Sequence, residues 1–125
     1  MNRFTGALLT LASCLAVASC GGDPGDESAQ GACGAYAQAP SSLDEKAQLR
    51  TTALERAQRA GEANGSYAAL QSDMQDAWAR SDAMATAHNA GRSVSGHQLD
   101  AYFAADKRVR SDCADAGSDI GPLEP

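Results

Sequence analysis

Two charged residues interrupt the apolar stripes of two expected helices, and they are the first candidates for chemistry. Arg50 lies on the apolar face of residues 42–60, and Asp106 lies on that of residues 95–116. At 1.5 Å per residue, Arg50 is about 12 Å and Asp106 about 16 Å from the shared end of the two helices. Trp78, on an antiparallel helix between them, falls at a similar level. We expect one polar layer, either an ion pair with the Arg50 stem packed on Trp78 or a notch that binds a polar ligand.

The other side chains that commonly bind metals or cofactors lack a motif. His88 and His97 flank an expected loop at a spacing that matches no metal site, and helix-end positions explain both. Met74 or Met84 with a histidine could hold haem in a helical bundle, but C-x-x-C-H is absent and Met at helical spacing is usually core. No nucleophile–base or phosphate-binding motif is present. We therefore expect no cofactor, no metal and no enzymatic activity.

The N-terminus has the plan of a signal peptide. Arg3 precedes an uncharged run from Phe4 that leads to Val17-Ala18-Ser19-Cys20. A run of about 14 residues is shorter than the roughly 20 needed to cross a bilayer as a helix. The last four residues resemble the lipobox of bacterial lipoproteins, in which signal peptidase II cuts before the cysteine and a diacylglycerol is attached to its thiol. The resemblance implies a signal peptide over residues 1–19 and a lipid anchor at Cys20 on the extracytoplasmic face of the cell membrane.

Three alternatives to a lipobox at Cys20 stay open: cleavage after Ala18, an uncleaved anchor, and a lipobox that ends at Cys14. The number of cysteines left after processing argues against the first of them. If cleavage removes Cys14 and lipidation uses Cys20, then Cys33 and Cys113 remain, whereas cleavage after Ala18 without lipidation leaves three thiols. We therefore predict a Cys33–Cys113 disulfide, with two independent thiols as the alternative. Such a disulfide would close a loop of about 80 residues.

Composition limits the size and the partners of the domain. Removing residues 1–19 from the 125 leaves 106, which is enough for one small domain. The chain is acidic, with 10 Lys and Arg against 16 Asp and Glu, so we expect no nucleic-acid partner and no electrostatic binding to anionic lipid. Large apolar residues are scarce and alanine is abundant. We expect a thin, closely packed core.

Capping signals and helical periodicity predict three helices and no strand. Ser42-Leu43-Asp44-Glu45 and Ser95-Gly96-His97-Gln98 have the form of capping boxes, and the segment 61–65 and Gly91 interrupt the helical pattern. The helices are expected over residues 42–60, 66–89 and 95–116. Residues at about 100° intervals form their apolar stripes. These are Leu43, Ala47, Leu54 and Ala57; Tyr67, Leu70, Met74, Trp78, Ala85 and His88; and Leu99, Tyr102, Phe103, Val109 and Cys113.

Three amphipathic helices joined by short loops favour a small all-α antiparallel bundle. We place it at residues 42–116, after a flexible tether and strap at 20–41 and before a C-terminal tail at 117–125. In an up-down-up bundle Cys113 lies about 25 Å above the start of the first helix, which an extended chain from Cys33 just spans and a helical one does not.

Two solutions to this distance stay open. Either residues 33–40 are extended, or the bundle is not a simple up-down-up arrangement. A four-helix arrangement with residues 30–39 helical is the alternative architecture.

The sequence predicts a location more clearly than a function. The first hypothesis is a membrane-anchored, non-enzymatic module that binds an envelope protein or polymer. The basic run Lys107–Arg110 is interpreted as a solvated helix face, with recognition of an anionic polymer as the alternative. The second hypothesis is a carrier of a small molecule or cofactor that uses the Arg50, Trp78 and Asp106 layer. A cavity beside those residues would favour the carrier.

Overall fold

The computed structural model describes residues 23–121, and all regular structure in that range is helical. The predicted all-α fold is therefore confirmed, but the predicted number of three helices is wrong. The elements are α2 (Asp26–Ala37), α3 (Leu43–Ala63), a 3-10 turn η1 (Gly65–Tyr67), α4 (Leu70–Asn89) and α5 (Gly96–Asp115). The predicted signal peptide, residues 1–19, and Cys20 lie outside the described residues.

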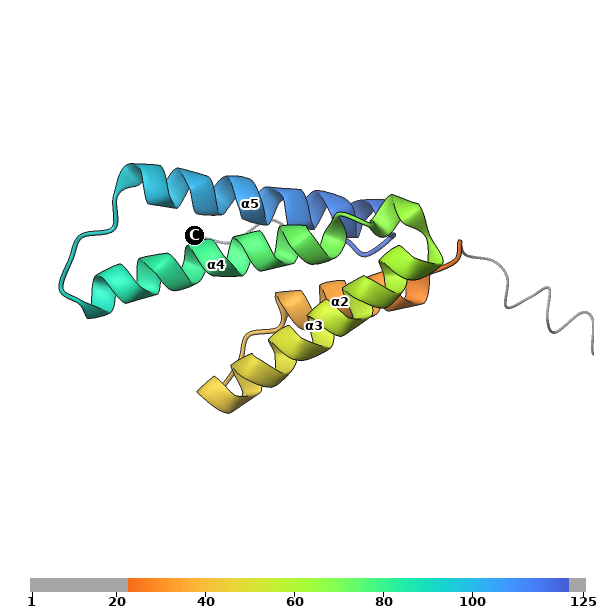
Figure 1. Ribbon diagram of the computed structural model, residues 1–125, viewed down its shortest axis with the longest axis horizontal. Helices are drawn as coiled ribbons and strands as arrows, with labels where there is room; N and C mark the ends of the chain where they lie inside the picture. The colour runs from red at the N-terminus through yellow and green to blue at the C-terminus, as the bar shows by residue number, and fades with distance from the viewer. Residues whose placement is uncertain (1–22, 122–125) are drawn as a thin grey trace, which may run out of the picture.

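The helices form two antiparallel hairpins, α2 with α3 and α4 with α5 (Figure 1). The hairpins meet at the end where α2 and α4 begin and where α3 and α5 finish. From there they diverge, so that the start of α3 lies far from the end of α4 (Figure 1). Because α2 has 12 residues and its partner α3 has 21, α2 stops well short of the start of α3.

Local capping explains where three of the helices begin or end. The Ser42 hydroxyl accepts a hydrogen bond from the backbone N–H of Glu45 at 3.1 Å, and Ser95 and Gln98 form the predicted reciprocal capping box. Glu45, however, accepts from the N–H of Ser41 rather than completing a box with Ser42. Gly91, at φ 72°, follows the end of α4 in a conformation that favours glycine.

The predicted disulfide joins Cys33 of α2 to Cys113 of α5, with their Cα atoms 5.8 Å apart. Residues 33–37 are the last turn and a half of α2, so the prediction of an extended strap is wrong. The alternative solution holds, because the bundle is not a simple up-down-up arrangement. Since α2 begins at the end where α5 finishes, Cys33 reaches Cys113 without an extended segment (Figure 1).

The core is built largely from alanine, as expected from composition. Alanines of α2 and α3 are fully or almost fully buried, which lets these two backbones pack closely. These are Ala29, Ala32, Ala53, Ala57 and Ala60. Leu70, Met74 and Val109 are the largest apolar side chains that are fully buried in the described range and lack a disulfide.

Several residues of the predicted apolar stripes are exposed. The buried face of each helix is therefore shorter than the stripe predicted for it. Leu43 is 82% exposed, Phe103 49% and Leu99 40%, and Ala47, Ala85 and His88 are also on the surface. These residues lie where the hairpins have diverged, and there a helix has only one neighbour to pack against. None of the described helices is both long and apolar enough to cross a membrane.

Candidate ligand-binding site

A pocket of about 240 Å³ lies where the two hairpins separate, beyond the last turn of α2. The four helices of residues 23–121 and the loop after α2 all contribute to its wall. Because α2 ends at Ala37, no helix fills the space that continues between α3, α4 and α5. The lining includes all three residues of the predicted polar layer and two further tyrosines. The principal side chains are Tyr36, Lys46, Leu49, Arg50, Trp78, Ser81, Tyr102, Asp106 and Arg110.

Arg50 packs on Trp78, as predicted, with its guanidinium carbon 5.3 Å from the ring centroid. Its carboxylate partner, however, is Asp82 rather than Asp106. Arg50 Nη1 and Nη2 donate to the two oxygens of Asp82 at 2.7 and 2.9 Å. This hydrogen bonding lowers the pKa of Asp82. Asp82 lies one turn after Trp78 on α4, so one Arg50 side chain contacts both.

Asp106 is buried, with 3% of its surface exposed, and both of its oxygens are paired. The Tyr36 hydroxyl donates to Oδ1 at 2.7 Å, and Arg110 Nε donates to Oδ2 at 2.6 Å. The predicted ion pair between Arg50 and Asp106 is therefore wrong, because Arg110, one turn further along α5, is the cation of this carboxylate. Arg110 also donates to the carbonyls of Ile120, at 3.1 Å, and Gly121.

Three aromatic rings make up much of the apolar wall. The ring centroids of Tyr36 and Trp78 are 5.3 Å apart at a tilt of 39°, an arrangement that aromatic pairs prefer. Burial, and then the hydrogen bond to Asp106, raise the pKa of Tyr36 above its ordinary value, and burial raises the pKa of Tyr102. Tyr36 was missed as a site residue because its segment was expected to be an extended strap.

The charges around the pocket are locally positive in an otherwise acidic chain. Lys46 Nζ lies 3.8 Å from Asp82 Oδ1, at the outer limit of an ion pair, while Arg50 makes the close contacts to that carboxylate. Three cations, Lys46, Arg50 and Arg110, thus face two carboxylates, Asp82 and Asp106. One positive charge is left over.

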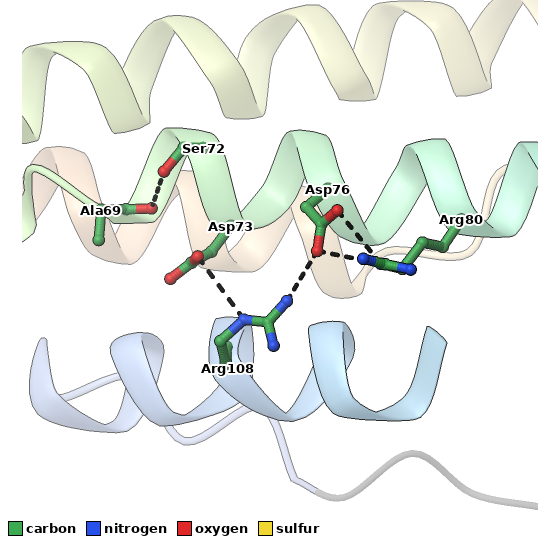
Figure 2. Close-up of polar contacts among 6 residues, drawn as sticks. All are labelled: Ala69, Ser72, Asp73, Asp76, Arg80 and Arg108. Carbon is green, nitrogen blue, oxygen red and sulfur yellow. Dashed lines mark hydrogen bonds and ion pairs between the residues drawn. The ribbon is translucent and has the colours of Figure 1, made fainter. Parts of the chain in front are cut away.

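A second polar cluster ties α4 to α5 outside the pocket. Figure 2 shows that Arg108 of α5 contacts both Asp73 and Asp76 of α4. The Arg108 nitrogens lie 2.7 Å from an oxygen of Asp76 and 3.8 Å from one of Asp73. Asp112 is the neighbour of Asp73, and burial, together with a hydrogen bond to Asp73, raises its pKa to about 7. The basic run is thus self-paired in part, since Arg110 pairs with Asp106 of the same helix, whereas Arg108 pairs with carboxylates of α4.

Groups of three or more metal-ligating side chains do not occur within residues 23–121. His88 and His97 are exposed near the loop that joins α4 to α5, away from the pocket. Comparisons of the chain with protein-family models, with curated proteins and with solved structures find no match.

Proposed function

We propose that this chain is an extracytoplasmic lipoprotein, anchored to the membrane at Cys20, that binds a small ligand in the pocket between its two hairpins. The observation that carries the proposal is the pocket itself. Residues from four helices meet there, including Arg50, Trp78 and Asp106 of the polar layer predicted from sequence. Small-molecule sites are usually concave and combine apolar side chains with placed polar groups, and the lining of this pocket combines both.

The hydrogen bonding of Asp106 and the protonation of Tyr36 favour binding over catalysis. Both Asp106 oxygens already accept hydrogen bonds, and the raised pKa of Tyr36 keeps its phenol protonated. Neither group is arranged as a general base beside a free nucleophile. The pocket is thus better suited to hold a molecule than to transform it.

The test of the pocket uses Trp78, the single tryptophan of the chain. The lipoprotein, purified in detergent, is titrated with a panel of small neutral, anionic and cationic aromatic and aliphatic compounds while its fluorescence is recorded. We expect saturable changes with some compounds. A Leu49→Phe substitution, which places a bulkier side chain on the pocket wall without adding a second tryptophan, should weaken or abolish the binding without unfolding the protein. If no compound produces a saturable change, the proposal fails.

The anchor has its own test. Cys20→Ala should abolish acyl labelling and release the protein from the membrane, because two or three acyl chains provide the stable attachment. Cys14→Ala is the matched control and should change neither. Unchanged labelling of the Cys20 variant would contradict the anchor.

A second candidate, a module that binds an envelope protein or polymer, is favoured by the exposed apolar side chains of the α4–α5 hairpin. Phe103 and Leu99 are 49% and 40% exposed on α5. Cross-linking in intact cells, followed by capture of the tagged lipoprotein, tests it. Reproducible enrichment of one envelope protein that Phe103→Ser abolishes would support it, and enrichment that survives Phe103→Ser would argue against this surface.

A further inference from the structure

The cations of the pocket lining differ in how closely they are paired. Arg50 Nε is buried and has no hydrogen-bond partner among the described residues, although the two terminal nitrogens of the same group are bound to Asp82. Within residues 23–121, the Lys46 ammonium makes a single charged contact, at 3.8 Å to Asp82 Oδ1. Because Arg50 Nε is enclosed by protein atoms, the loosely paired Lys46 is the cation that a ligand can engage.

The two carboxylates that neighbour these cations, by contrast, are closely paired. Tyr36 and Arg110 engage the two oxygens of Asp106, and Arg50 engages those of Asp82. Because each of these carboxylates already has a close cationic partner, a cationic ligand finds no uncompensated negative charge there. An anionic ligand meets the loosely paired Lys46 without breaking any of these contacts.

The charge left over indicates a single negative charge on the ligand. Three cations against two carboxylates leave one positive charge, which a carboxylate balances. A phosphate dianion would bring a second negative charge close to Asp82 and Asp106, and the pocket lining has no further cation to balance it.

The apolar wall specifies the rest of the ligand. Trp78 and Tyr36 offer ring faces and edges, and Leu49 and Pro40 add aliphatic surface. A dry cavity of about 150 Å³ is known to hold benzene. A pocket of about 240 Å³ therefore has room for one aromatic ring and a short chain.

We infer that the pocket selects a small monocarboxylate that carries an aromatic ring, with the carboxylate at Lys46 and the ring against Trp78 and Tyr36. The inference rests on the proposed function, since it names the ligand class of the same pocket.

Three isosteric probes test the charge. The lipoprotein in detergent is titrated with 3-phenylpropionate, 3-phenylpropanamide and 3-phenylpropylamine, with Trp78 fluorescence as the signal and calorimetry as the check. The carboxylate should bind about tenfold more tightly than the amide, since charge-assisted hydrogen bonds are roughly twice as strong as neutral ones. The amine should bind more weakly than the amide. Equal or reversed order overturns the inference.

Matched variants test the position of the carboxylate. Lys46→Gln should weaken 3-phenylpropionate binding by about three- to tenfold and leave the amide unaffected. Lys107→Gln removes the same charge from an exposed position of α5 outside the pocket lining and should change neither. Equal weakening by the two variants would mean that net charge, rather than Lys46, attracts the anion, and would overturn the inference.

The outcomes separate the ligand class from the pocket function. If the amide or the amine binds best at Trp78, the ligand class is wrong and the pocket still binds small molecules. If neither these probes nor the wider panel perturbs Trp78 saturably, the proposed function fails and the inference fails with it.

Discussion

The Tyr36 hydroxyl donates a hydrogen bond to Asp106 at 2.7 Å, across 70 residues of sequence, and so ties the last turn of α2 to the middle of α5. This contact closes one wall of the pocket at the point where α2 ends. It also places an aromatic ring 5.3 Å from Trp78. The two hairpins are therefore held together at the pocket by a polar contact as well as by the disulfide.

Tyr36→Phe should lower the free energy of unfolding by about 1–3 kcal/mol, because it leaves a buried oxygen of Asp106 without its donor. Urea denaturation measures the change. Tyr102→Phe is the matched control, since the Tyr102 hydroxyl has no hydrogen-bond partner within residues 23–121, and its effect should be smaller. Equal losses in the two variants would show that the Tyr36–Asp106 contact does not contribute to stability.

Replacing both Cys33 and Cys113 by alanine should destabilise the domain by about 4–5 kcal/mol, the chain-entropy value for a loop of this length. The bond joins residues 80 apart in sequence. Denaturation with and without reductant provides the measurement. Reductant should destabilise the parent protein strongly and the double variant not at all. A parent protein that reductant leaves unchanged would contradict a structural role for the bond.

Asp112 should make the domain less stable as pH rises. Burial and Asp73 raise its pKa from 3.8 to about 7, so the folded state binds its proton more tightly than the unfolded state does. The stabilising contribution is complete below about pH 4 and is lost as pH rises through 7. Melting temperature across this window measures it, and Asp112→Asn should flatten this part of the profile.

Asp100→Asn, at an exposed position of α5, is the control for that titration and should leave the pH profile of the parent unchanged. The assignment of this titration to Asp112 would be contradicted if the melting temperature of the parent protein rose from pH 4 to pH 7 and the Asp112→Asn variant had the same profile.

Ala57→Leu should destabilise the domain by about 1–3 kcal/mol, because a larger side chain forces apart the closely packed α2 and α3. Ala57 is 1% exposed, whereas Ala47, on the same helix, is exposed. Ala47→Leu makes the same chemical change on the surface, and denaturation should detect little effect. If Ala57→Leu is equally mild, the two helices do not pack as described.

The sequence predicted the helices that carry their own start and stop signals. Ser42 and Ser95 cap α3 and α5, and Gly91 follows the end of α4. α2 carries no comparable signal, because Gly25 precedes it without a side-chain cap and the helix contains Gly31 and Gly34. Tertiary contacts, including the disulfide, stabilise this helix.

The candidate site could be predicted where it depends on the helices whose bounds were predicted. Helical register placed Arg50 against Trp78, because both residues lie on helices whose bounds were nearly right. The partners of Arg50 and Asp106 were not predictable, since Asp82 lies outside the predicted apolar stripes and Arg110 was interpreted as part of a solvated run. The position of Tyr36 in the pocket could not be predicted, because Tyr36 lies in the last turn of α2 and that segment was expected to be extended.

The most direct test of a binding pocket between the hairpins is the response of the Trp78 indole N–H in the NMR spectrum of the lipoprotein during titration with 3-phenylpropionate. We expect a saturable shift of this resonance that is reduced or lost in Leu49→Phe. The backbone resonance of His97, which is exposed and lies away from the pocket, should stay in place. A Trp78 resonance that does not move, or that moves in proportion to ligand without saturation, would contradict a binding pocket between the hairpins.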